Sequence, residues 1–212
     1  SRTDDVMKKL AYWYVYDGRG RLVSKKLPGA AVSEYRYDPA GRIVAERDGR
    51  LANDTWHLYV YDGCGRQVAK YRCGMMDSEI AEFASVCRTA SLTTAADEYD
   101  RGGYALSPVP EAWPGDVVWA KYYDDYRFVA LRGLGAEFAF EASASAPFYA
   151  SATGLLTGMY TGSGYEAYYY NGEGREVQRC ATGYNSGRRC TAYNYDGTIA
   201  SRTYTYTEPY LP

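Results

Sequence analysis

Tyrosine recurs at alternate positions along this chain, in short runs that each end at an acidic or amide residue. One tyrosine stands three residues before that residue and a second stands one residue before it. Successive side chains of a strand point to opposite faces, so a spacing of two puts both rings on one face. The runs predict five strands with a repeat tyrosine ladder made of Tyr14, Tyr16, Tyr35, Tyr37, Tyr59, Tyr61, Tyr168, Tyr170, Tyr193 and Tyr195.

The residues after each tyrosine pair predict a tight hairpin turn. In the first four copies an acidic or amide residue is followed by two variable residues, glycine and arginine. The acid can accept hydrogen bonds from N–H groups of the turn, and the glycine suits the left-handed position of a type I turn with a G1 bulge. The predicted turn residues are Asp17, Gly20, Arg21, Asp38, Gly41, Arg42, Asp62, Gly65, Arg66, Asn171, Gly174, Arg175 and Asp196, the last in a shortened copy without Gly-Arg.

The same acids and arginines have a functional interpretation as a row of catalytic or ligand-binding groups. Five copies of one pattern favour turn chemistry and pairing between strands instead. We therefore expect no catalytic residues among them, and no enzymatic activity.

The repeat stops between about residue 75 and residue 153. Residues 77–91 predict a short amphipathic helix, with Asp77 or Ser78 as N-cap. The side chains at helical spacing are Ile80, Phe83, Ala84 and Cys87.

Three further stretches complete this middle part. Residues 107–115 contain three prolines and predict an extended loop. Residues 115–131 predict a strand pair that contains a degraded copy of the repeat, centred on Tyr122, Tyr123, Asp124 and Asp125. Residues 135–151 alternate and are rich in small side chains, which favours an edge strand or an excursion from the sheet.

These patterns predict a mainly β fold in which consecutive antiparallel hairpins form a twisted, partly open sheet. A short helical and irregular insertion packs on the same sheet. We expect one continuous domain, with hairpins in residues 1–74, the insertion in 75–153 and hairpins again in 154–212. Each hairpin needs its neighbours to bury one face, so a few repeats form an incomplete assembly.

Composition and charge exclude several kinds of partner. The 25 tyrosines and 22 glycines among 212 residues favour strands and tight turns. The formal net charge is −2 and no long basic run occurs, so we expect no nucleic-acid partner. No stretch reaches the ~20 apolar residues that span a bilayer.

The residues that carry chemistry elsewhere are sparse. His57 is the single histidine and the five cysteines form no CxxC pair, so we expect no metal and no cofactor. Cys180 and Cys190 lie on neighbouring predicted strands and could form a disulfide. The alternative is that both are small buried apolar residues.

The pattern Y-x-Y-D-x-x-G-R-x-V resembles the YD repeat of the RHS (rearrangement hot spot) family. Copies at 14–23, 35–44, 59–68 and 168–177, and a shortened one at 193–200, carry the resemblance. It implies an internal fragment of a larger bacterial protein, extracellular or on the cell surface, without enzymatic activity. In that family the hairpins build a hollow shell that encloses a C-terminal toxin.

The resemblance also implies partners, namely the rest of the parent chain and its C-terminal cargo. The chain has too few repeats to close a shell, and it lacks a toxin domain and the aspartyl-protease-like region that releases the cargo. Only the hairpin role is therefore carried over to these residues.

An alternative function is a carbohydrate- or cell-surface-binding module, since exposed aromatic faces stack on sugar rings. Its candidates are Trp13, Trp56, Trp113 and Trp119 with nearby tyrosines. Independently of either function, exposed sheet edges predict edge-to-edge self-association.

Overall fold

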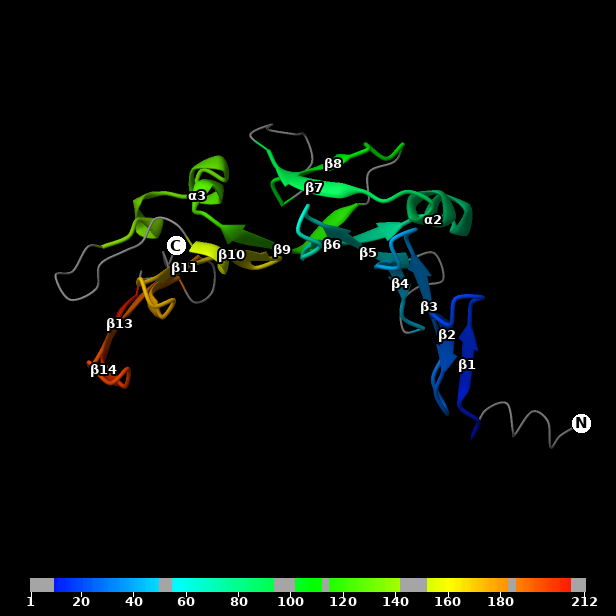
Figure 1. Ribbon diagram of the computed structural model, residues 1–212, viewed down its shortest axis with the longest axis horizontal. Coiled ribbons are helices and arrows are strands. Elements are labelled where there is room, and N and C mark those ends of the chain that lie inside the picture. The colour runs from blue at the N-terminus through cyan, green and yellow to red at the C-terminus, as the bar shows by residue number, and fades with distance from the viewer. Residues whose placement is uncertain are drawn as a thin grey trace, which may run out of the picture. The chain divides into compact units, whose positions relative to one another are not determined.

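The computed structural model in Figure 1 consists mainly of antiparallel strands. It describes residues 10–49, 55–93, 102–111, 115–141, 152–182 and 186–206. The chain divides into two compact units, residues 1–91 with 105–116 and residues 92–104 with 117–212. The predicted fold class, mainly β with consecutive antiparallel hairpins, is confirmed.

The first unit contains a meander of six strands, each antiparallel to the one before it (Figure 1). They are β1 (Trp13–Tyr16), β2 (Leu22–Lys26), β3 (Val32–Tyr37), β4 (Ile43–Arg47), β5 (Thr55–Tyr61) and β6 (Gln67–Gly74). Strands β1 and β2, β3 and β4, and β5 and β6 form the hairpins expected from the first three repeats. In each hairpin the register shifts just before the last tyrosine, between Val15 and Tyr16 in the first, as a G1 bulge requires.

The two faces of this sheet differ in their burial. Trp56 and Leu58 of β5 are fully buried, while His57 and Tyr59, which alternate with them, are only half-buried. Ala45 of β4 pairs with Leu58 and therefore shares the apolar face. The core lies on one face, and Tyr59 lies on the other.

Helix α2 (Asp77–Ala84) covers the apolar face at β3 and β4. Its Ile80 and Phe83 are buried, as the helical spacing predicts. The guanidinium of Arg47 links the helix to the sheet, since it donates to the carboxylate of Asp77 at 3.1 Å and lies 4.5 Å from the centre of the Trp56 ring.

The helix differs from its prediction at both ends. Met76 is the N-cap, and its N–H donates to the Glu79 carboxylate at 2.7 Å, so neither Asp77 nor Ser78 caps the helix. The helix ends at Ala84, so Cys87 lies beyond it and is exposed. The residues that follow instead form strand β7 (Thr89–Leu92), which pairs with β8 (Tyr104–Ser107).

The second unit is also a meander of six strands. They are β9 (Asp116–Asp124), β10 (Ala152–Thr161), β11 (Gly164–Tyr170), β12 (Glu176–Ala181), β13 (Gly187–Tyr193) and β14 (Ile199–Tyr206). Each is antiparallel to the next, and β11 with β12 and β13 with β14 form the hairpins of the fourth and fifth repeats.

Two short helices each contribute a buried phenylalanine to the core of this second unit. They are α3 (Arg127–Leu131) and the 3-10 helix η1 (Ala136–Phe138). Phe128 of α3 stacks on Tyr122 with ring centres 4.3 Å apart, and Tyr126 stacks on Tyr169 at 4.6 Å. Gly158 lies opposite Tyr122 in the register of β9 and β10. Its missing side chain leaves the space that Phe128 occupies.

The predicted strand pair at 115–131 is wrong, because β9 is followed by α3 and not by a second strand. Asp124 adopts φ +74° where the strand ends, and the N–H of Arg127 donates to the Asp125 carboxylate at 3.0 Å. The acid and the arginine are two residues apart here, whereas they are four apart in the hairpin turns, and helix α3 begins at this arginine. In 135–151 the described part forms η1 and no edge strand, and residues 142–151 lie outside the described residues.

Strands β1 and β14 each pair with one neighbour only among the described strands, and their side chains are exposed. Within the described residues, no helix has the length and apolar character needed to cross a membrane.

Replacing Gly158 by alanine tests the packing of the second unit. The added Cβ would lie 2.1 Å from Cζ of Phe128, so the ring must move, and we expect a loss of about 1–3 kcal/mol in the free energy of unfolding. The matched control is Gly162→Ala in the same hairpin, where a Cβ meets no atom within 4 Å. Urea unfolding measures both, and equal losses would contradict the packing described.

Candidate functional site

The recurring site of this protein is the hairpin turn, which the first repeat shows in full. The N–H of Asp17 donates to the carbonyl of Arg21, and the N–H of Gly20 donates to the carbonyl of Asp17, both at 2.9 Å. Gly20 has φ +76°, a left-handed conformation that a Cβ would penalise. The glycines at the same place in the other four hairpins, Gly41, Gly65, Gly174 and Gly197, also have positive φ.

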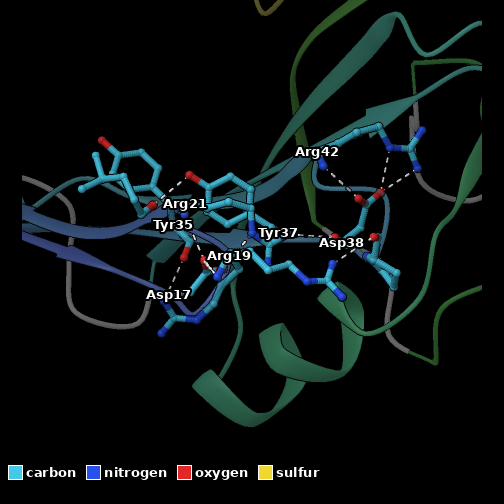
Figure 2. Close-up of polar contacts among 10 residues, drawn as sticks. Asp17, Arg19, Arg21, Tyr35, Tyr37, Asp38 and Arg42 are labelled. Carbon is cyan, nitrogen blue, oxygen red and sulfur yellow. Dashed lines mark hydrogen bonds and ion pairs between the residues drawn. The ribbon is translucent and has the colours of Figure 1, made fainter.

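The acid of the turn holds the arginine that opens the return strand, an arrangement we call the clasp. One carboxylate oxygen of Asp17 accepts from the N–H groups of Arg19 and Arg21, and the other accepts from Nε of Arg21 at 2.7 Å (Figure 2). Asp38 holds Arg42 with the same geometry, and Asp62 holds Arg66.

The three clasps of the first unit differ in burial, and the Asp62 side chain, at 14% exposed, lies between the other two. The Asp17 side chain is 22% exposed, whereas that of Asp38 is completely buried. Hydrogen bonds from the backbone and the guanidinium of Arg21 outweigh desolvation and lower the pKa of Asp17. A buried carboxylate such as that of Asp38 requires its guanidinium partner, because an unpaired charge is costly to bury.

The fourth repeat has an amide in place of the acid. Oδ1 of Asn171 accepts from the N–H groups of Glu173 and Arg175, so the turn keeps its shape. An amide has only one acceptor oxygen, and Arg175 pairs with Glu173 at 2.8 Å instead.

The structure corrects the alignment of the fifth repeat by two residues. Asn194, and not Asp196, occupies the first turn position, because its N–H donates to the Thr198 carbonyl and its own carbonyl accepts from Gly197 N–H. Thr198 therefore stands where the other repeats have arginine. Asp196 lies inside the turn and accepts from the N–H and hydroxyl of Thr198. With Asn194 as the first turn residue, the positions three and one before it are Thr191 and Tyr193. The predicted pair of Tyr193 and Tyr195 is therefore wrong.

A second contact joins consecutive repeats, and we call it the joint. The guanidinium of Arg21 lies 4.6 Å from the ring centre of Tyr37 in the next hairpin, and the Tyr37 hydroxyl donates to the Leu22 carbonyl at 2.8 Å. The guanidinium also donates to the carbonyl of Asp38 at 3.3 Å (Figure 2). The clasped Arg21 thus touches the hairpin that follows it.

The joint recurs at two further pairs of hairpins. Arg42 lies 4.7 Å from the Tyr61 ring centre, and the Tyr61 hydroxyl donates to the carbonyl of Ile43. Arg175 lies 5.6 Å from the ring centre of Tyr193, whose hydroxyl donates to the carbonyl of Glu176. A cation over an aromatic ring contributes about 0.5–2 kcal/mol according to its exposure.

Strands β10 and β11 have the hydroxyl–carbonyl contact of the joint but no arginine over the ring. The Tyr170 hydroxyl donates to the Leu156 carbonyl at 2.6 Å, as the other joint tyrosines do with their own partners. Extending the register of these strands puts Leu155 opposite Tyr170, where the joint has arginine. The hydroxyl contact therefore persists without the cation.

The first tyrosine of each pair contacts charged groups of the same face. Lys25 lies 5.3 Å from the Tyr35 ring centre, and the Tyr59 hydroxyl donates to the Glu46 carboxylate at 2.6 Å. Tyr168 donates to Glu166 and lies 4.9 Å below the guanidinium of Arg179. Among the described residues, the repeat tyrosines do not stack ring on ring, so rings and charges alternate in place of the predicted ladder.

The tyrosines at the ends of the chain are the exceptions. Tyr14 and Tyr16 in β1 are exposed, and the ring of Tyr195 is fully exposed at the tip of the last turn. Sequence reasoning missed the pairing of arginine with the next repeat's tyrosine. The signal that could have shown this pairing is the position of the arginine, which follows the turn glycine directly in each of the first four repeats.

The other candidate residues form no common site. All five cysteines are free, and Gln178 rather than Cys180 lies opposite Cys190, so these two cysteines form no disulfide. No cluster of three or more His, Cys, Asp or Glu residues that could hold a metal occurs among the described residues. His57 is half-buried on β5, and burial together with Lys70 and Arg72 lowers its pKa despite Glu46 and Asp48.

The described tryptophans among those proposed for sugar binding lie in different surroundings. Trp56 is fully buried in the core, Trp13 is exposed on β1, and Trp119 lies under Lys121 at 4.7 Å on β9. Trp113 lies outside the described residues.

A shallow hollow of about 370 Å³ lies over strands β11 to β14, with Tyr204 and Tyr206 at its side. Its guanidinium groups already have carboxylate partners within the sheet, since Arg179 pairs with Glu166 and Arg189 pairs with Glu176. Arg188, the third guanidinium of the hollow, pairs with Glu141, and among the described lining residues only the Nε atoms of Arg188 and Arg189 are buried without a hydrogen-bond partner.

Comparison with known proteins gives one family. Residues 16–51, which contain the second hairpin and most of the first, match the family described as RHS repeat. No curated protein matches. Among solved structures, the crystal structure of TcdB2-TccC3 is 14% identical with a TM-score of 0.33, and the match covers 92% of this chain and 10% of that chain. The chain thus spans about a tenth of that relative's length.

Substituting the buried clasp tests its contribution to stability. Asp38→Ala removes the acceptor of two turn contacts and leaves Arg42 without its carboxylate, so we expect a loss of about 2–4 kcal/mol in the free energy of unfolding. Asp38→Asn should lose less, because Asn171 holds the same turn shape. Asp17→Ala, at the more exposed clasp, should also lose less. Urea midpoints at constant m-value give the ranking, and a ranking led by Asp17→Ala would contradict it.

The half-buried tyrosines predict a loss of stability at alkaline pH. Burial and the hydrogen bond to Glu46 raise the pKa of Tyr59 above its ordinary value. The folded state therefore holds the proton more tightly, and its stability falls as pH rises above about 10, where the unfolded tyrosine ionises. Tyr59→Phe should lose less stability than the wild type between about pH 10 and 11. The control is Tyr195→Phe at the exposed turn, which should follow the wild type.

Proposed function

We propose that this chain, which carries RHS repeats, is a non-enzymatic scaffold segment of a larger extracellular or cell-surface bacterial protein. Its hairpins contribute to a β-sheet wall that encloses a C-terminal cargo in the parent chain. The structural role is supported by the repeat itself. The enclosure of a C-terminal cargo and the extracellular or cell-surface location are what we add to it.

The joint is the observation that carries the proposal. It uses the characteristic arginine and second tyrosine of the repeat to attach one hairpin to the next at three places. These residues make carboxylate–guanidinium and hydroxyl–carbonyl contacts inside the sheet, which supports a structural role for them. A meander extended in this way becomes wider by one hairpin with each further repeat.

The second candidate, a glycan-binding module, has less support. Its aromatic candidates are divided between the buried core and separate strands, and the charged groups near the exposed Tyr204 and Tyr206 are paired with each other. A stacking platform needs exposed rings with free polar groups beside them.

Protease protection in the parent protein tests the enclosure. We expect the C-terminal cargo to resist digestion while the hairpins are intact, and Asp38→Ala to make it several-fold more susceptible because the wall opens at that clasp. The control is Asp77→Ala, which removes one exposed carboxylate from an ion pair outside the turns. Cargo that is digested at the same rate in all three proteins would contradict the proposal.

A further inference from the structure

Tyr16 occupies the position of the joint tyrosine in the first hairpin but has no joint. In the hairpins that follow, Tyr37 and Tyr61 each lie under an arginine and donate to a carbonyl of the preceding strand. Tyr16 is 58% exposed, and within the described residues its ring and hydroxyl have no such partner. The tyrosine ring and hydroxyl of a joint are present, and no described strand lies at this edge to contact them.

The rest of β1 supports an unfilled strand position. Trp13, Tyr14 and Val15, with Tyr12 just before the strand, are all about half exposed or more, so apolar and aromatic side chains are exposed on both faces of this edge strand. Its outer backbone groups pair with no described strand, since β1 pairs with β2 alone. A strand edge with unpaired backbone groups is a template for another strand.

We propose that the open edge of β1 binds the return strand of an RHS hairpin from outside this chain. The arginine that opens that strand lies over the Tyr16 ring, and the Tyr16 hydroxyl donates to the carbonyl of the residue after the arginine. This rests on the proposed scaffold function and continues an interface that the chain forms three times, between β2 and β3, β4 and β5, and β12 and β13.

The register of the established joints specifies the incoming strand. Extending the pairing of β2 with β3, and of β4 with β5, puts Arg21 opposite Tyr37 and Arg42 opposite Tyr61. Four residues beyond each arginine, Lys25 or Glu46 contacts the first tyrosine of the next pair. The incoming strand therefore needs arginine opposite Tyr16 and a charged residue four positions later, where it meets Tyr14.

The chain's own last strand does not meet this requirement. Thr198 stands in the place of the arginine before β14, and Asn194 stands in the place of the acid that would hold it. A second copy that added its β14 to β1 would leave Tyr16 without a cation. The joint thus favours an arginine-bearing hairpin over head-to-tail pairing of identical chains.

A hairpin taken from this chain is a direct probe of the edge. We would measure binding of a fluorescent, backbone-cyclised peptide of residues 32–47, which contains Asp38 and Arg42, to the full chain by anisotropy. We expect saturable binding that weakens about fivefold when the peptide carries Arg42→Thr or the protein carries Tyr16→Ala. Because the two substitutions remove one contact, both together should weaken binding little further. Tyr195→Ala is the matched control, since it removes another exposed tyrosine outside β1.

The reverse experiment gives the chain the missing arginine. The variant Asn194→Asp with Thr198→Arg should associate head to tail, so that its mass in light scattering rises at concentrations at least several-fold lower than for the wild type. Adding Tyr16→Ala should return it to wild-type behaviour. A peptide that binds regardless of Arg42 and Tyr16, or a wild type that associates as strongly as the variant, would overturn the proposal.

These results are separable from the scaffold function. If the peptide does not bind while Asp38→Ala still exposes the cargo to protease, the scaffold stands and the assignment of the β1 edge fails. If Asp38→Ala leaves the cargo protected, the scaffold function fails whatever the peptide does.

Discussion

A guanidinium held between two repeats is the interaction on which the rest of this structure depends. The carboxylate of its own turn fixes the arginine, and the fixed arginine lies over the tyrosine of the next hairpin. Clasp and joint are therefore connected, because a side chain already immobilised by its turn loses little further entropy when it stacks. Stability passes from neighbour to neighbour in this way, as in other repeat proteins.

The helices have a different role in the two units. Helix α2 covers the apolar face of the first unit's sheet, and α3 with η1 supplies aromatic rings to the second. In the first unit Tyr59 lies on the opposite face, where charged side chains surround it. A hairpin with one face in the core and one in a charged network can be stable without burying its tyrosines in apolar surroundings.

Sequence reasoning succeeded where the determinant is local. The turn glycines have positive φ because the predicted G1 bulge demands it, and in the first hairpin the register shifts between Val15 and Tyr16. It failed where a distant contact decides. Residues 127–131 form a helix because Phe128 fills the space above Gly158, a residue 30 positions away in the sequence. The fifth repeat was misaligned because Tyr195-Asp196 imitates the motif, whereas the hydrogen bonds place Asn194 first.

The sequence by itself determined the hairpins and their turns, because each depends on residues close together in the chain. Only the tertiary structure decided which side chains meet across repeats. Arg21 and Tyr37 are 16 residues apart, and their contact depends on the register of β2 and β3, which a pattern of alternation cannot specify to one residue without the partner strand. Tyr16 is open because β1 pairs with β2 alone among the described strands.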